Sequence, residues 1–119
     1  MKIIAGGVAK AEVAEILKPL LRSQDEVTVS GDMDAAVKLQ TQQADFYLGT
    51  CHTGAGASLG VLVGVLGGSR CHTFGRGVPA AEEVDQVLAD GAVALGFSMD
   101  QIHEAVPVIY DALIRKVGV

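Results

Sequence analysis

The residue types best suited to chemistry lie in one short stretch that begins at Cys51 and ends at Ser58. This stretch follows a short apolar run, reads Cys-His-Thr-Gly-Ala-Gly-Ala-Ser, and precedes an apolar helical segment. A glycine-rich turn between a strand and a helix exposes backbone N–H groups at the positive end of the helix dipole, and both features attract anions. We therefore predict a site for an anion or a carbonyl oxygen, formed by His52, Thr53, Gly54, Ala55, Gly56, Ala57 and Ser58.

Cys51 is the candidate reactive group of this stretch. It ends a buried strand next to a helix N-terminus, an environment that generally lowers the pKa of a thiol and makes it reactive. The same position equally suits a cysteine that acts only as a small buried hydrophobic residue. His52 could polarise a ligand or tune the thiol, but adjacent strand residues point to opposite faces, so we expect His52 to face solvent.

The triplet Cys-His-Thr occurs a second time, at Cys71-His72-Thr73, and two Cys with two His could form a zinc site. However, Cys51 ends its strand, whereas Cys71 lies near the start of the next parallel strand. At about 3.3 Å per residue, the two cysteines would be roughly a strand's length apart, which is too far for shared coordination. We expect no metal and no cofactor, and we expect Cys71 and His72 to be core or edge residues.

Hydrophobic periodicity predicts five strands that alternate with five helices. The strands are expected at residues 2–5, 26–30, 46–50, 70–74 and 92–95. Helices are expected after Gly7, after Asp32 as an N-cap, at residues 55–66, from Pro79 at the first helical position to Asp90-Gly91, and after a capping box at Ser98–Gln101, with Pro107 inside the last helix. This alternation indicates a single α/β domain over residues 1–119, a three-layer α/β/α structure with a parallel sheet, Rossmann-like or flavodoxin-like.

Ligands of such sheets bind beyond the C-terminal ends of the strands, where the strand order reverses. Gly6 and Gly7 follow the first predicted strand, and Asp32 follows the second, so we include all three in the binding site. Arg76 follows the fourth strand and has the geometry to grip a phosphate or carboxylate, although a solvated loop charge explains it equally well.

Composition narrows the function further. The net charge of −5 and an aromatic content of 4% disfavour nucleic-acid binding. No signal peptide is visible, and the long uncharged run at residues 46–69 is too polar and too rich in glycine for membrane insertion, so we expect a cytoplasmic protein with free thiols. The third predicted helix is apolar all round, with Gly60, Gly64 and Gly68 at four-residue spacing. It must be buried by the sheet and its neighbours or by a second subunit, and we expect a homodimer or higher homo-oligomer.

Nearly the whole chain resembles the YhfU-like bacterial domain-of-unknown-function family. The resemblance is carried by Ile3-Ile-Ala-Gly6, Gly31-Asp-Met-Asp-Ala-Ala36, Tyr47-Leu-Gly-Thr-Cys-His-Thr-Gly-Ala-Gly-Ala57 and Val93-Ala-Leu-Gly-Phe97. This family implies no activity.

The Cys51–Ser58 stretch is similar to the Cys-Gly-Thr-Gly-x-Gly-x-Ser loop of the ribose-5-phosphate isomerase B and galactose-6-phosphate isomerase family, and the segment at residues 90–96 resembles a second part of it. This resemblance implies that Cys51 is the base that moves a proton between C1 and C2, that Thr53 assists, and that the N–H groups of Gly54 to Ser58 stabilise the enediolate. In place of that family's Asp-His pair, this chain has Gly6-Gly7-Val8. His52 replaces the first loop glycine, and only Arg76 and Arg115 could stand for the phosphate-binding arginines.

Two functional hypotheses follow. In the first, the chain has an anion or phosphosugar pocket at Cys51–Ser58 and acts as an isomerase-like enzyme on a sugar phosphate, with Cys51 as base. In the second, it is a non-catalytic binding or accessory module, such as a soluble component of a sugar transport or phosphotransfer system. The pH dependence of thiol reactivity separates them, because a thiolate formed near neutral pH favours chemistry.

Overall fold

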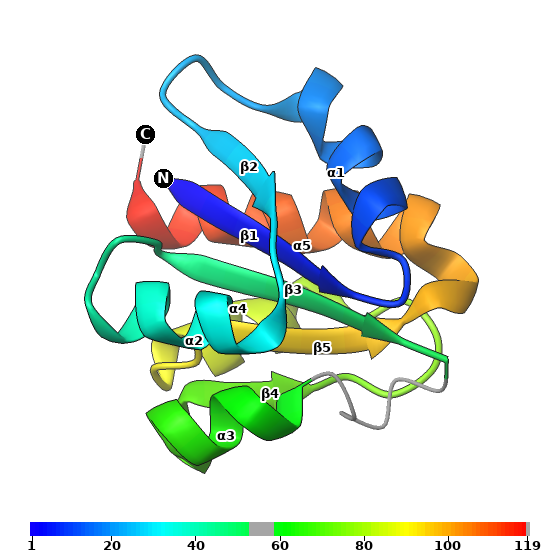
Figure 1. Ribbon diagram of the computed structural model, residues 1–119. Helices are drawn as coiled ribbons and strands as arrows, with labels where there is room; N and C mark the ends of the chain where they lie inside the picture. The colour runs from blue at the N-terminus through cyan, green and yellow to red at the C-terminus, as the bar shows by residue number, and fades with distance from the viewer. Residues whose placement is uncertain (53–58, 119) are drawn as a thin grey trace.

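The structure, a computed structural model, describes residues 1–52 and 59–118. Its centre is a five-stranded, wholly parallel sheet with the strand order β2-β1-β3-β5-β4 (Figure 1). The strands are β1 (Lys2–Gly7), β2 (Glu26–Val29), β3 (Phe46–Cys51), β4 (Cys71–Thr73) and β5 (Ala94–Ser98). The predicted α/β class with a parallel sheet is confirmed.

Helices cover both faces of the sheet, as right-handed connections between parallel strands require. They are α1 (Lys10–Leu17), α2 (Asp32–Gln40), α3 (Gly60–Leu66), α4 (Ala81–Ala89) and α5 (Ile102–Val117). One face packs against α1, α4 and α5, and the other against α2 and α3, which lie side by side (Figure 1).

The alternation of side chains along each strand divides the core between these two layers. Ile3, Phe46 and Leu48 join the larger cluster with α1, α4 and α5, whereas Ile4 and Tyr47 join the smaller one with α2 and α3. By the same alternation, Cys51 shares the face of Tyr47. The core is mostly aliphatic, as the scarcity of aromatic residues predicts.

Several predicted boundaries are wrong, and most of the strand ends differ by one or two residues. Gly31, not Asp32, is the N-cap of α2, so Asp32 is the first helical residue. Helix α4 begins at Ala81 after the extended N-cap residue Ala80, so Pro79 lies outside the helix. Strand β5 starts two residues late and continues through Gly96 to Ser98. Gly96 does not end the strand, because it packs closely: a Cβ there would lie 3.1 Å from side-chain atoms of Leu59 and Thr73.

The third helix is less buried within the chain than its composition predicts. Helix α3 buries only Leu62 completely and leaves Val63 43% exposed. A Cβ added at Gly60 or at Gly64 would meet open space. Burial by the sheet and neighbouring helices therefore does not account for the apolar residues on the outer side of α3.

Candidate functional site

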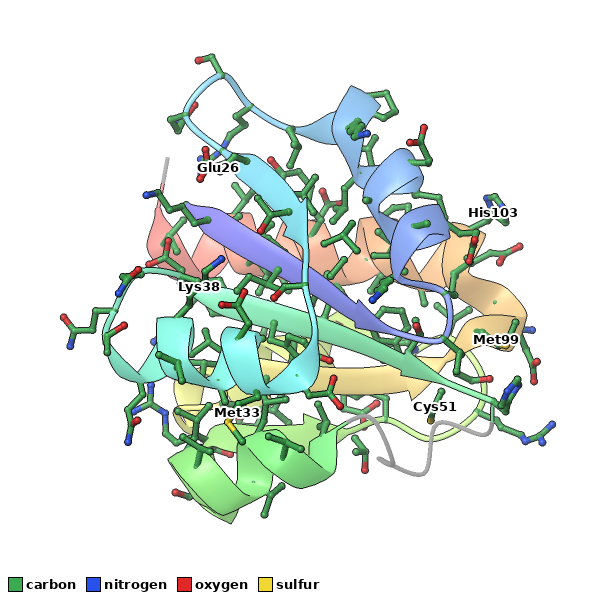
Figure 2. All side chains as sticks on the ribbon, viewed as in Figure 1. Glu26, Met33, Lys38, Cys51, Met99 and His103 are labelled. Atoms are coloured by element: carbon green, nitrogen blue, oxygen red, sulfur yellow. The ribbon has the colours of Figure 1, made fainter. Side chains whose placement is uncertain are left out.

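The strand order reverses between β1 and β3, since the chain passes from β1 outward to β2 on one side and later to β3 on the other. Gly7 and Cys51 end these two strands, and Cys51 is level with Ser98 at the end of β5. The Cys51 side is thus the edge where open parallel sheets bind ligands. Cys51 itself is 6% exposed, and in Figure 2 it lies at the same end of the sheet as Met99.

Thr50 ties the end of β3 to the turn after β1. Its buried hydroxyl donates to the Gly6 carbonyl at 3.2 Å and accepts the Ala9 N–H at 2.8 Å, while its carbonyl accepts the Val8 N–H at 3.1 Å. Because both partners of the hydroxyl are backbone groups, this side chain fixes the path of the turn next to Cys51.

Gly6 and Gly7 are needed for close packing at this junction. A Cβ on Gly6 would collide with the ring and hydroxyl of Tyr47. Gly7 has a φ of +85°, which favours glycine, and a Cβ there would collide with the backbone of Thr50. The two glycines lie where we predicted them, at the sheet's C-terminal edge, but their missing side chains leave room for β3 itself.

Asp32 is joined to this junction through Tyr47. The Tyr47 hydroxyl donates to Asp32 Oδ1 at 3.0 Å. Burial of the phenol, reinforced by the nearby carboxylate, raises the pKa of Tyr47 above its usual range, so the hydroxyl remains a donor. Asp32 is only partly buried, but the fully buried Tyr47 holds its carboxylate in place at the edge of the site.

A second set of contacts joins the ends of β3, β4 and β5. The Ser98 hydroxyl donates to the His52 carbonyl at 3.3 Å and accepts the Asp100 N–H at 3.2 Å. Arg76 Nη1 lies 3.4 Å from Asp100 Oδ2. His52 is exposed, as strand alternation predicts. Arg76 is also exposed, and it forms an ion pair with Asp100.

The second Cys-His-Thr triplet lies at the other end of the sheet. Cys71 is level with Ala94 at the start of β5, four residues before the level of Cys51, so the two cysteines do not share a site. Burial raises the pKa of the Cys71 thiol. His72 packs edge-on against Phe74 with ring centroids 4.8 Å apart. In residues 1–52 and 59–118 no three His, Cys, Asp or Glu side chains are placed to hold a metal ion.

The remaining predicted site residues, Thr53, Gly54, Ala55, Gly56, Ala57 and Ser58, lie outside the described residues, as do the expected first residues of the third helix. Sequence reasoning missed Tyr47, Thr50 and Asp100. A buried tyrosine needs a partner for its hydroxyl, so Tyr47 was the one of the three that carried a signal. Thr50 reads in the sequence as an ordinary β-branched strand residue.

None of the helices in the described part of the chain is long and apolar enough to cross a membrane.

Comparison with known proteins gives a sequence family and a fold. A family model described as "Protein of unknown function DUF2620" matches residues 1–113. The "Uncharacterized protein YhfU" of Escherichia coli K12 is 32% identical over 114 residues, which is 94% of this chain and 97% of that protein, and the Shigella flexneri protein of the same description matches equally.

Among solved structures, ribose-5-phosphate isomerase B from Thermotoga maritima is similar, with a TM-score of 0.72, 19% identity, and coverage of 95% of this chain and 85% of that one. The ribose-5-phosphate isomerase B of Giardia lamblia gives a TM-score of 0.69 at 16% identity, with coverage of 96% and 94%. At these identities the likeness shows a common fold.

Proposed function

The chain belongs to the family described as protein of unknown function DUF2620, and we propose that it binds a small anionic ligand of the sugar-phosphate type at the C-terminal edge of its sheet. The observation that carries this proposal is the position of Cys51. It ends β3 beside the point where the strand order reverses, in a fold shared with ribose-5-phosphate isomerase B.

The proposed site combines the Cys51–Ser58 stretch with the surrounding strand ends. The backbone N–H groups of Gly54, Ala55, Gly56, Ala57 and Ser58 would receive the anionic oxygen, with His52 at the rim. Gly6 and Gly7 would form the wall on the β1 side. Asp32, held by Tyr47, would accept hydrogen bonds from ligand hydroxyl groups, and Arg76 would approach the phosphate from the β4 side.

The proposed reaction is an isomerisation in which Cys51 removes a proton from the hydroxyl-bearing carbon next to a carbonyl group and returns it to the former carbonyl carbon, while the hydroxyl proton passes to the former carbonyl oxygen. Thr53 would assist, and the N–H groups of the turn would stabilise the enediolate oxygen. Cys51 suits this role by its position, because it ends β3 at the ligand edge and is only 6% exposed.

Two contacts favour the alternative, a non-catalytic binding or accessory module. Tyr47 fills the space beside Gly6, so no side chain from β1 reaches the site. Arg76 is already paired with Asp100, which weakens its attraction for a phosphate. A binding module needs neither an additional acid nor a strong phosphate clamp.

We also propose that the protein forms a homodimer or a higher homo-oligomer. The outer side of α3 exposes Val63 next to Gly60 and Gly64, and neighbouring α2 exposes Met33 and Val37. In Figure 2, Met33 lies where α2 approaches α3. A second copy of the chain would cover this apolar surface.

The test of ligand binding is the thermal stability of the protein against a panel of sugar phosphates, measured in parallel for Cys51→Ala. A ligand that binds only the folded state raises the melting temperature by mass action. A shift by a phosphate ester that persists in Cys51→Ala, together with turnover of that ester by the wild type alone, supports the enzyme. A shift without turnover supports the binding module. No shift by any phosphorylated compound contradicts the sugar-phosphate pocket and favours an accessory module with a protein partner.

A further inference from the structure

A separate cavity of about 530 Å³ lies at the opposite edge of the sheet, where the strands begin. Phe46, the first residue of β3, and Val93, which precedes β5, form part of its wall. In Figure 1 this is the edge where β3 starts and α5 ends, away from the end of β3 that carries Cys51. Its volume falls within the range of small-molecule sites.

Two cations from distant parts of the chain line this cavity. Arg70 belongs to the short 3₁₀ turn Gly68–Arg70 before β4, and Lys116 belongs to the last turn of α5. Asp45 is the one carboxylate among the lining residues that the structure describes, and it already accepts the Lys2 N–H at 2.7 Å. The lining therefore carries a net charge of +1, whereas the whole chain carries −5.

Neither cation has a carboxylate partner within the described residues. By contrast, Arg22, Arg76 and Arg115 each form an ion pair, with Asp25, Asp100 and Asp85 respectively. The backbone of Arg70 is nevertheless fixed, since its carbonyl accepts the Val93 N–H at 2.8 Å and its own N–H donates to Gly67. The backbone of Arg70 is thus anchored, while the N–H donors of its guanidinium remain available.

Gln42 supplies a neutral polar group to the same cavity. It follows α2 with a φ of +62°, a conformation in which glycine is usual. The N–H of Gln43 donates to the Lys38 carbonyl at 2.7 Å, and glycine at position 42 would allow the same hydrogen bond at the end of the helix. The side chain of Gln42 is therefore not needed to end the helix. The side-chain amide of Gln42 forms no hydrogen bond with any residue that the structure describes, and it can pair with a ligand.

The remaining lining favours an apolar ligand body over a bare inorganic ion. Leu39, Leu88 and Val117 come from the last turns of α2, α4 and α5. The carbonyl groups and negative dipole ends of these helices oppose any anion, so a bare ion gains little beyond its attraction to Arg70 and Lys116. An organic anion gains contact with the apolar side chains while its charged group lies between Arg70 and Lys116.

We propose that this cavity is a second ligand site, for a small organic anion with an apolar body, in which Arg70 and Lys116 bind the charged group and Gln42 adds a hydrogen bond. The site is independent of the ligand edge at Cys51.

The test is a fluorescence titration of the full chain with anilinonaphthalene sulfonate, followed by competition with phenylbutyrate and with inorganic phosphate. The wild type should bind one equivalent saturably, and phenylbutyrate should displace the probe much better than phosphate does. Arg70→Gln and Lys116→Gln should each weaken binding roughly ten-fold, because each removes a charged hydrogen-bond donor.

Arg115→Gln is the matched control for Lys116→Gln. It lies next in the sequence and makes the same change in charge, but Arg115 pairs with Asp85 and does not line the cavity. It should change the affinity less than two-fold. Melting curves of all variants confirm folding, which should persist because the three side chains are exposed. Absent saturable binding, an equal loss in Arg115→Gln, or equal displacement by phosphate would overturn the proposal.

Discussion

The hydroxyl of Tyr47 lies beside the backbone of Gly6, in the space that a side chain at position 6 would need. Tyr47 is completely buried, and its hydroxyl continues outward to a 3.0 Å hydrogen bond with Asp32. Tyr47 of β3 thereby fills the space that the absent side chain of Gly6 leaves beside β1. Its hydroxyl also orients the Asp32 carboxylate at the proposed ligand edge.

Replacement of Gly6 by alanine should destabilise the fold. The added Cβ collides with the Tyr47 ring, and overpacking of this kind costs about 1–3 kcal/mol of the free energy of unfolding. Urea denaturation measures the loss. Gly64→Ala is the control, because its Cβ meets open space in a helix and should gain up to about 1 kcal/mol. A Gly6→Ala variant as stable as the wild type would contradict the packing described for Tyr47.

Thr50→Val should also destabilise the protein, because it leaves the buried Ala9 N–H without its acceptor. An unsatisfied buried donor costs about 1–3 kcal/mol. Thr50→Ser keeps the hydroxyl and should lose less than the valine variant, although valine matches threonine more closely in shape. The free energies of unfolding from urea titrations distinguish the two, and a serine variant less stable than the valine variant would refute the role of the hydroxyl.

Stability should fall with decreasing pH because of Asp25. Its buried carboxylate accepts from Arg22 Nε at 2.8 Å, from the Met1 amino group at 2.8 Å and from the Tyr110 hydroxyl at 2.6 Å. The hydrogen bond from Arg22, aided by the Met1 amino group and Tyr110, holds the pKa of Asp25 well below its usual range despite burial.

Because the pKa of Asp25 is lower in the folded than in the unfolded state, its ionised carboxylate stabilises the fold. This contribution to the free energy of unfolding is fully present above the unfolded-state pKa of about 4 and is lost progressively as the pH falls below that value. Asp25→Asn should cost about 3 kcal/mol at pH 7, since it leaves two cations without their buried partner. The difference between wild type and Asp25→Asn, measured by urea unfolding at several pH values, should narrow under acid conditions. A constant difference down to about pH 3 would show that the carboxylate is not the source.

Self-association should depend on the outer side of α3. Val63→Asp places a charge on the apolar surface formed with Met33 and Val37, and it should shift the protein to a lower oligomeric state in sedimentation velocity. Val78→Asp is the matched control, because Val78 is similarly exposed, at 41%, but lies in the segment before α4. A wild-type monomer at all concentrations, or equal behaviour of the two variants, would contradict the proposed interface.

Local patterns were enough to predict the sheet and its helices, because most strands carry an apolar or β-branched run and most helices carry a periodic apolar face. They also placed Cys51 and Gly7 at one edge, since parallel strands all end on the same side. The contacts that shape this edge were not predictable in the same way. Thr50 bonds to Gly6 and Ala9, more than forty residues away, and no local propensity records such a pairing.

Predicted strand ends were wrong where close packing, rather than local sequence propensity, determines how far the strand extends. The fifth strand was predicted to end at residue 95, but Gly96 lies inside β5, where Leu59 and Thr73 pack closely against its backbone. The cavity at the opposite edge was also not predictable, because Arg70 and Lys116 come to line it together only when the strands are ordered as β2-β1-β3-β5-β4.

Alkylation of the two cysteines shows whether a sugar phosphate binds at the edge that Cys51 occupies. The native protein is treated with iodoacetamide over a range of pH, with and without the sugar phosphate that stabilises it most, and mass spectrometry follows each cysteine separately. Cys71 is the internal control at the far end of the sheet. The ligand should slow modification of Cys51 and leave Cys71 unchanged, and in a catalytic site the Cys51 reaction should already be fast near neutral pH. Equal rates of Cys51 alkylation with and without the sugar phosphate would show that the ligand does not bind at this edge.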